Sequence, residues 1–249
     1  MKISVVIATY NADQTLARAL ESVCCQTYSD IEIIVVDGIS TDNSVAIVKR
    51  YQYIHDTIPI RSFVGRDSGI YDAINKGVSL AVGDWVFFMG ADDVLYDEYV
   101  FQDIIAAENG NDIQHDLILG HIEFDNKKVR KSSISAKTRY INTVHHQSAF
   151  YRRKLFDLFT YNSDYRISAD YELNLKIFLE RMNVLRIERL VCIVGMGGVS
   201  GRVDYRGYAE EIEIRNNYLQ SGCLRTIMNC ATRMRYIYKK CLLSLFWKE

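Results

Sequence analysis

Short apolar runs alternate with helical patterns through the first half of the chain, and this alternation limits the possible fold more than any other feature. The apolar runs cover residues 3–8, 31–36, 60–64 and 85–89. Helical periodicity covers the segment after the first run through Gln26, then 42–53 and 70–81. Repeated strand–helix units of this kind build a parallel sheet covered by helices. We therefore predict an α/β fold with a mostly parallel central sheet flanked by helices.

The second half of the chain is expected to complete this sheet. Residues 117–152 show short β-like runs with a turn at 124–127, and helical periodicity returns over 170–181. No internal repeat or linker divides the sequence. We predict one domain over residues 1–222, followed by a C-terminal helix over 223–249.

Composition argues against several functional classes. The 249 residues carry 30 Lys plus Arg against 31 Asp plus Glu, so no excess of positive charge predicts a nucleic-acid partner. The six cysteines include no Cys-x-x-Cys pair, and no signal peptide opens the sequence, which favours reduced thiols and a cytoplasmic location. The apolar runs are strand-sized, far below the roughly 20 residues of a membrane-spanning helix.

Polar residues follow three of the predicted strands. They are Thr9 with Tyr10, Asp37, and Asp92 with Asp93. In open α/β sheets ligands bind at the carboxyl edge, where these residues are expected. Neither a Gly-x-Gly-x-x-Gly turn nor a Gly-x-x-x-x-Gly-Lys-Ser/Thr loop occurs, which argues against nicotinamide enzymes and P-loop NTPases.

The adjacent carboxylates Asp92 and Asp93 end a fully apolar strand. Two acids at such a place are destabilising unless a cation neutralises them, and a divalent metal with oxygen ligands would do so. A solvated turn is the alternative interpretation. A metal here would bridge phosphates and neutralise charge as a phosphate leaving group departs, so we predict a nucleotide-linked substrate.

Five segments together resemble glycosyltransferase family 2. They are Ser4–Asn11, Leu20–Thr27, Ile33–Asp42, Asp67–Gly77 and Gly90–Asp93, in the order and spacing of that family. The segment Gly69–Lys76 resembles bacterial members that build capsule, exopolysaccharide or O-antigen repeat units. The resemblance implies a GT-A fold, a nucleotide-sugar donor, a saccharide or lipid-linked saccharide acceptor, and Mg²⁺ or Mn²⁺ as cofactor.

The resemblance also implies roles for individual residues. The expected donor-binding residues are Thr9, Tyr10, Asp37, Asp67 and Asp92. Tyr10 and Asp37 would lie near the base, Asp92 would face the ribose or the metal, and Asp93 would bind the metal. The family often has a second Asp where Gly38 stands and another acid where Gly90 stands.

Asp170 is the candidate catalytic base. It lies where the family carries a Glu-Asp pair or a lone Asp before a helix, and Ala169 here replaces the frequent Glu. An inverting transfer needs one carboxylate to take the proton of the attacking acceptor hydroxyl. The spacing alone favours a helix N-cap, and the resemblance reverses that preference.

Three further residues are expected to contact the acceptor or the donor phosphates: Arg66, His146 and Arg202. His146 follows His145, and neighbours on a strand point to opposite faces, so one of the two can line the cleft. A structural histidine is the alternative. Arg202 follows the glycine-rich segment 195–201, which is placed either as an active-site lid or as an ordinary loop.

The predicted C-terminal helix is basic and amphipathic. Its apolar stripe comprises Met234, Ile237, Tyr238, Cys241, Leu242 and Leu245. Two interpretations are open: the helix docks on anionic lipid at the inner face of the cytoplasmic membrane, or it packs its stripe on the domain. The aromatic residues Tyr236, Phe246 and Trp247 favour the membrane.

Together with these features, the resemblance implies an inverting glycosyltransferase of the hexosyltransferase type, active in cell-surface polysaccharide biosynthesis. One alternative is a nucleotidyltransferase, which also uses a carboxylate-bound metal on an α/β sheet. Another is a non-catalytic scaffold that binds a nucleotide sugar or a glycan.

Overall fold

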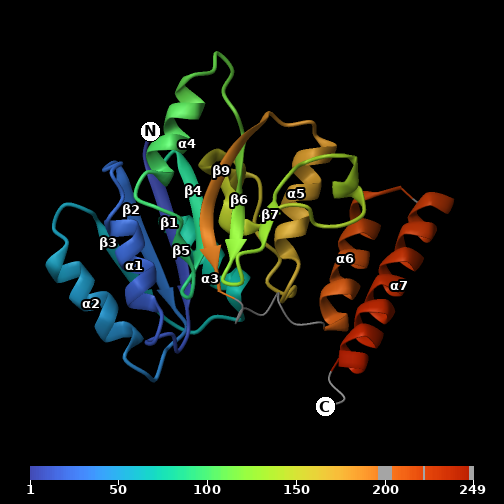
Figure 1. Cartoon of the computed structure of the whole chain (residues 1–249), viewed down its shortest axis with the longest axis horizontal. Helices are drawn as coiled ribbons and strands as arrows, with labels where there is room; N and C mark the ends of the chain where they lie inside the picture. The colour runs from blue at the N-terminus through green and yellow to red at the C-terminus, as the bar shows by residue number, and fades with distance from the viewer. Residues whose placement is uncertain (196–203, 221, 247–249) are drawn as a thin grey trace.

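The computed structural model describes residues 1–195, 204–220 and 222–246. These residues form one nine-stranded sheet with helices packed against it (Figure 1). The strands are β1 (Ile3–Thr9), β2 (Ile31–Asp37), β3 (Ile60–Val64), β4 (Trp85–Gly90), β5 (Val94–Leu95), β6 (Leu117–Phe124), β7 (Val129–Lys131), β8 (Ala149–Arg152) and β9 (Val184–Val194). The α-helices are α1 (Leu16–Cys24), α2 (Ser44–Ile54), α3 (Ile70–Leu80), α4 (Val100–Asn109), α5 (Ala169–Leu179), α6 (Tyr205–Tyr218) and α7 (Cys223–Phe246). Three 3₁₀ turns, at Ala136–Arg139, His146–Ser148 and Arg153–Asp157, complete the description.

The strand order is β3-β2-β1-β4-β8-β6-β9-β5, with β7 paired to β6. Strands β3, β2, β1 and β4 are parallel neighbours, and β6 and β9 form a second parallel pair. Strand β8 runs antiparallel to both β4 and β6 and joins the two parallel parts. The predicted α/β fold is therefore confirmed, and the helices expected at 42–53, 70–81 and 170–181 are α2, α3 and α5.

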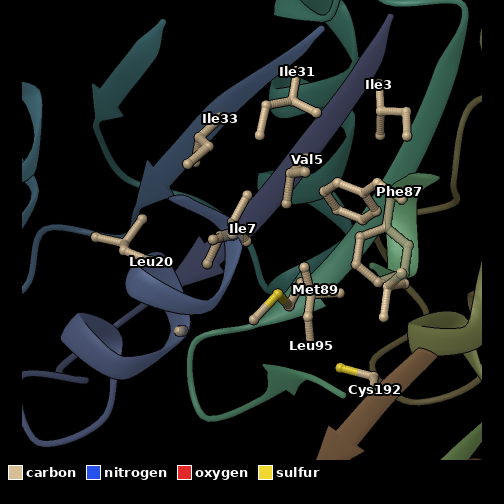
Figure 2. Close-up of a cluster of buried hydrophobic side chains, with 14 of the residues drawn as sticks. Ile3, Val5, Ile7, Leu20, Ile31, Ile33, Phe87, Met89, Leu95 and Cys192 are labelled. Carbon is tan, nitrogen blue, oxygen red and sulfur yellow. The ribbon is translucent and has the colours of Figure 1, made fainter. Parts of the chain in front are cut away.

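Both faces of the parallel strands β1, β2 and β4 are buried. Ile3, Val5 and Ile7 of β1 point into a core shared with α1, α2 and α4 (Figure 2). Val6 points to the opposite face, into a second core shared with α3 and α5. Strands covered on both faces are apolar throughout rather than alternating, which explains the uninterrupted apolar runs of the sequence.

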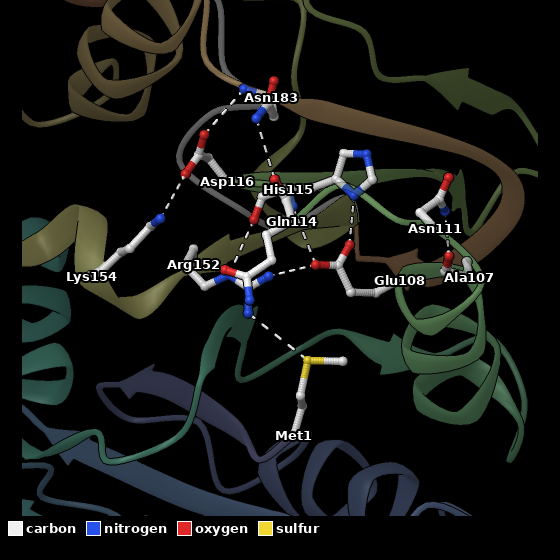
Figure 3. Close-up of polar contacts among 10 residues, drawn as sticks. All are labelled: Met1, Ala107, Glu108, Asn111, Gln114, His115, Asp116, Arg152, Lys154 and Asn183. Carbon is white, nitrogen blue, oxygen red and sulfur yellow. Dashed lines mark hydrogen bonds and ion pairs between the residues drawn. The ribbon is translucent and has the colours of Figure 1, made fainter.

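A polar network closes the amino end of the sheet (Figure 3). The buried Glu108 of α4 accepts a hydrogen bond from Arg152 Nη2 at 2.5 Å and lies 2.7 Å from His115 Nδ1. The Arg152 guanidinium also lies 4.0 Å from the centre of the Trp85 ring. Trp85 begins β4, so this network lies at the opposite end of that strand from Asp92 and Asp93.

Helix α7 packs on α6 through a polar face (Figure 1). The fully buried Arg215 of α6 donates to Asn229 Oδ1 at 2.8 Å and to Thr232 Oγ1 at 3.2 Å. Arg235 forms an ion pair with Glu211. The α7 residues at this interface are therefore mostly polar or basic.

The apolar stripe predicted for the C-terminal helix does not pack on the domain where its side chains are described. Met234, Ile237 and Tyr238 are 63%, 51% and 66% exposed. The polar face of α7 packs on α6 because Asn229 accepts a hydrogen bond from the buried Arg215, and Arg235 pairs with the Glu211 carboxylate. Across the described ranges, no helix is both long and apolar enough to cross a membrane.

Candidate active site

The loops after β1 and β2 are held together by hydrogen bonds at the carboxyl edge of the sheet. The buried Asp37 accepts hydrogen bonds from Ser40, at 2.7 Å from its backbone N–H and at 2.6 Å from its hydroxyl. Ser40 Oγ in turn accepts the backbone N–H of Asn11 at 2.8 Å. Ile39 between them has a φ of 64°, which is strained for a β-branched residue. Asp37, expected to contact the donor, thus also orders this loop.

Three of the expected donor-binding residues surround the start of these loops. Thr9 Oγ1 is buried and has no hydrogen-bond partner among the described residues, as expected of a hydroxyl that awaits a ligand. Tyr10 is 64% exposed. A Cβ placed on Gly38 would lie 2.7 Å from Asp67 Oδ2 and 3.4 Å from Tyr10 Cδ2. Gly38 therefore leaves room for the Asp67 carboxylate beside the Tyr10 ring.

Asp92 and Asp93 follow β4 at the same edge. Asp93 is 1% exposed and accepts the backbone N–H of Gly90 at 2.7 Å and that of Gly195 at 3.2 Å. Burial and the neighbouring Asp92 charge raise the pKa of Asp93 to about 6. A cation would relieve the repulsion between these two carboxylates. Their hard oxygen atoms fit Mg²⁺ or Mn²⁺. No cluster of three or more His, Cys, Asp or Glu side chains able to hold a metal occurs in the described ranges.

Asp170 lies in the first turn of α5, the helix that packs in the second core with α3. Its Oδ2 accepts a hydrogen bond from Asn142 Nδ2 at 2.6 Å, and its Oδ1 lies 3.1 Å from the Tyr71 hydroxyl. Burial raises the pKa of Asp170 to about 6, although these hydrogen bonds oppose the shift. A carboxylate with a pKa near neutrality is suited to general base catalysis.

Glu210 of α6 fixes the chain just before Asp170. Its buried carboxylate accepts three consecutive backbone N–H groups, from Arg166 at 2.8 Å and from Ile167 and Ser168 at 2.9 Å each. The start of α5 is thus anchored by a side chain from a separate helix.

The segment that carries Asp67 meets the segment that carries Asp170. Gly69 precedes α3 with a φ of 134°, and a Cβ there would lie 2.3 Å from Arg166 Nη1. Tyr71 of α3 provides the second contact, through Asp170 and the carbonyl oxygen of Ile167. The structure therefore brings the expected donor side and the expected base together.

The remaining expected contacts differ in their surroundings. His146 Nε2 lies 2.9 Å from the Tyr161 hydroxyl, its ring stacks on Phe88, and burial lowers its pKa to about 3. A neutral imidazole can accept or donate a hydrogen bond but cannot offer a positive charge to phosphate. Arg66 is exposed, and its carbonyl oxygen accepts Lys76 Nζ at 2.7 Å. Arg202 and residues 196–201 lie outside the described residues.

Sequence reasoning missed several polar residues around the two acidic centres. Gln147 hydrogen-bonds Asp93, and Tyr71 contacts Asp170. Both lie in segments that the sequence had already singled out, so their hydrogen-bonding groups could have been noticed. Asn142 and Glu210 gave no signal, because their partners are far away in the sequence.

The family model of Glycosyl transferase family 2 matches residues 4–173. The chain belongs to this family. It is therefore a glycosyltransferase, and the nucleotidyltransferase alternative loses its support. Over 193 residues, the chain is 34% identical to a PGL/p-HBAD biosynthesis glycosyltransferase of Mycobacterium bovis (strain BCG / Pasteur 1173P2), which covers 76% of this chain and 74% of the relative.

Solved structures confirm the GT-A fold of this glycosyltransferase. Staphylococcus aureus TarS 1-349, crystallised with UDP, matches with a TM-score of 0.72 and 17% identity over 96% of this chain and 72% of that one. The mannosyltransferase PcManGT of Pyrobaculum calidifontis, solved with GDP-Man and Mn²⁺, matches with a TM-score of 0.67 and 16% identity over 94% of this chain and 69% of that one.

Proposed function

We propose that this glycosyltransferase moves a sugar from a nucleotide-sugar donor to a saccharide hydroxyl, with inversion at the anomeric carbon. One observation carries the proposal: the Asp170 carboxylate, with its raised pKa, is held beside the segment that carries Asp67. Structures of similar fold were solved with UDP, UDP-GlcNAc and GDP-Man, which supports a nucleotide-sugar donor.

In this proposal the donor lies along the carboxyl edge of the sheet. Thr9, Tyr10, Asp37 and Asp67 contact the nucleoside. Asp92 and Asp93 would hold Mg²⁺ or Mn²⁺, which would supply positive charge to stabilise the leaving diphosphate. Arg66 and Arg202 are the proposed phosphate contacts, and His146, being neutral, is proposed as a hydrogen-bonding contact to the acceptor.

Asp170 performs the proton transfer. Its carboxylate accepts the proton of the acceptor hydroxyl while that oxygen attacks the anomeric carbon from the face opposite the diphosphate. The bond between the anomeric carbon and the diphosphate oxygen breaks, and the nucleoside diphosphate leaves with the electron pair.

A donor screen tests this proposal. Purified protein with Mn²⁺ or Mg²⁺ and a panel of UDP-, GDP- and dTDP-sugars should release nucleoside diphosphate from one donor when a membrane lipid extract supplies the acceptor. Asp170→Asn should lower turnover by at least about 100-fold while donor binding persists. Asp112→Asn, which changes an exposed acid between α4 and β6, serves as the matched control. Donor binding without any transfer would favour the scaffold alternative, and unchanged turnover in Asp170→Asn would remove the base.

We propose a lipid-linked saccharide of a cell-surface polysaccharide, of the exopolysaccharide or O-antigen type, as the acceptor. The relative named for PGL/p-HBAD biosynthesis supports a role in building cell-surface glycans. The outward face of α7 supports attachment to the inner face of the cytoplasmic membrane. Leu224 and Ile227 are 54% and 58% exposed and extend the exposed stripe of Met234, Ile237 and Tyr238.

Charge complementarity points to anionic lipid as the partner of this face. Arg233 and Lys240 are exposed beside the stripe, and basic residues beside exposed apolar ones favour anionic headgroups. Residues 223–249 would thus serve as an attachment helix for the transferase domain over 1–222.

Vesicle co-sedimentation tests this attachment. The protein should bind vesicles of phosphatidylglycerol and phosphatidylcholine, and less of it should bind as salt rises. Ile237→Glu should reduce the bound fraction severalfold, because a charge then enters the apolar face. Ile113→Glu alters another exposed isoleucine outside α7, 62% exposed against 51% for Ile237, and should bind like the wild type. Equal loss in both variants, or no binding to anionic vesicles, would contradict the proposal.

A further inference from the structure

The hydrogen bond from Asn142 to Asp170 has a direction that the backbone fixes. The backbone N–H of Val144 donates to Asn142 Oδ1 at 3.2 Å. Because a backbone N–H can only donate, the amide oxygen of Asn142 must face Val144. The amide nitrogen therefore faces Asp170 and donates to Oδ2 at 2.6 Å.

This direction continues through two more buried side chains. Asn174 Nδ2 donates to the same Asn142 oxygen at 3.2 Å, and the Tyr151 hydroxyl donates to Asn174 Oδ1 at 3.0 Å. Asn174 and Tyr151 are both fully buried. Every donor in the chain thus points towards Asp170, and such a chain strengthens the last hydrogen bond to an ionised carboxylate.

The Tyr71 hydroxyl contacts Oδ1, the other carboxylate oxygen of Asp170, and its direction of donation is not fixed by the backbone. It lies 2.8 Å from the carbonyl oxygen of Ile167 and 3.1 Å from Asp170 Oδ1, and it has one proton to donate. When Asp170 is ionised, the hydroxyl can donate to Oδ1. When Oδ1 carries a proton, the hydroxyl can rotate to donate to Ile167 and accept from Asp170. Oδ1 therefore has a partner in both protonation states, whereas Oδ2 always faces a donor.

We infer that Asn142 and Tyr71 are positioning residues that direct the proton of the acceptor hydroxyl to Oδ1 of Asp170. The inference rests on the proposed function of Asp170 as the base. In the step, the acceptor O–H bond breaks and its proton binds Oδ1. The freed electron pair of the acceptor oxygen forms the bond to the anomeric carbon.

Other titratable groups near Asp170 do not compete for this proton. They are tyrosines from three elements: Tyr71 of α3, Tyr151 of β8 and Tyr161 before α5. Burial raises the pKa of each well above its usual value, so all three stay neutral. Glu210 of α6 acts on the Tyr71 hydroxyl in the same direction.

The two residues should differ in their effect on the pH dependence of turnover. Asn142→Ala removes a donor that binds the ionised carboxylate more strongly than the neutral acid, so the acid limb of the kcat profile should move up by about one pH unit. Tyr71→Phe removes a partner from both forms, so the plateau kcat should fall roughly tenfold with a smaller shift of the limb. The donor KM should stay unchanged in both variants.

A direct measurement accompanies the kinetics. Carboxyl resonances of ¹³C-labelled aspartate, with Asp170 assigned by its loss in Asp170→Asn, should show the same upward pKa shift in Asn142→Ala. Asn142→Asp keeps the shape of the side chain and replaces the donor by a second carboxyl group. It should move both the limb and the resonance further upward, because two close carboxylates cannot easily ionise together.

Tyr51→Phe is the matched control for loss of a tyrosine hydroxyl. The Tyr51 hydroxyl contacts Ala17 and Glu21 in the core on the other face of the sheet, so this variant should keep the wild-type acid limb. If Asn142→Ala and Asn142→Asp lose stability but keep the wild-type limb and the wild-type Asp170 pKa, Asn142 is only structural and the inference fails. If Asp170→Asn keeps its turnover, the proposed base itself is wrong, which is a separate result.

Discussion

At the scale of single residues, the two acidic centres of the site are unfavourable for stability. Asp93 and Asp170 are both held where burial raises their pKa to about 6. An acid whose pKa is raised by folding destabilises the folded protein at pH values where it is ionised. Catalytic sites often carry this kind of penalty, and the hydrogen bonds around Asp170 reduce it without removing it.

Asp170→Asn should therefore stabilise the protein at pH 7.5 while it lowers turnover. The folded pKa of about 6 lies above the ordinary value of 3.8, so the wild type loses stability as pH rises from about 4 to about 6. The full shift corresponds to about 3 kcal/mol, and we expect about 1–2 kcal/mol for this partly exposed group after solvent screening. Urea unfolding at pH 4, 5, 6 and 7.5 measures the difference. The variant should match the wild type at pH 4, and equal stability at pH 7.5 would refute the penalty.

At the scale of elements, close packing of α3 on the sheet places Tyr71 where it meets Asp170. Gly77 of α3 lies close against the sheet, and a Cβ there would lie 2.3 Å from Val6 Cγ1 and 3.4 Å from Val36 Cγ2. Both valines belong to buried strands that cannot easily move. A glycine is required here by space rather than by backbone conformation.

Gly77→Ala should lower the free energy of unfolding by about 1–3 kcal/mol, because the added methyl group overpacks the interface between α3 and β1. Gly110→Ala is the matched control, since the nearest atom to a Cβ there is the carbonyl oxygen of Ala106 at 3.4 Å. The control should change stability by less than about 0.5 kcal/mol. Chemical denaturation of both variants measures the difference, and a Gly77→Ala protein as stable as the control would show that α3 can shift.

The helices and strands were largely predictable from the sequence. Which face of a helix packs, and against which element, was not. Strands β1, β2 and β4 were evident because strands buried on both faces give continuous apolar runs. The apolar stripe on α7 was also evident, but the sequence could not show which face of the helix packs. That choice depends on Arg215 and Glu211 of α6, which select the polar face.

The site was predicted to a similar degree. Asp92 and Asp93 stood out because two adjacent acids after an apolar strand are conspicuous, whereas Asp170 was chosen through the family resemblance. The attachment of Asp37 to Ser40 depends on a local loop conformation that includes a left-handed Ile39. The contacts of Asn142 and Glu210 arise only when distant segments meet. Local patterns therefore reveal which residues carry charge at the site, and only the tertiary structure reveals what sets their protonation and orientation.

At the scale of the whole molecule, the carboxyl edge of one sheet gathers the proposed donor-binding and metal-binding residues from four separate segments. Thr9, Asp37, Asp67 and Asp93 all lie at or near this edge. A ligand that contacts several of these segments stabilises the folded state, because it binds only when they are assembled.

The cognate donor together with Mn²⁺ should raise the melting temperature. At a ligand concentration about 100 times Kd, the gain is about 2.7 kcal/mol, which corresponds to roughly 5–10 °C for a domain of this size. EDTA should remove most of this shift, and Asp93→Asn should not show it. Differential scanning fluorimetry measures the effect, with Asp112→Asn as the control. A donor-dependent shift that is insensitive to EDTA would argue against the proposed metal.

Helix α6 connects α7, the proposed membrane-binding helix, to the segment that carries the proposed base Asp170. Arg215 on this helix holds α7, and Glu210 on the same helix holds the chain just before Asp170. If α7 lies on the bilayer, the height of the catalytic carboxylate above the lipid is set by a rigid helix rather than by a tether. Acceptors would then be selected by how far their terminal sugar stands from the membrane, so the enzyme would measure the length of a growing glycan as well as its chemistry.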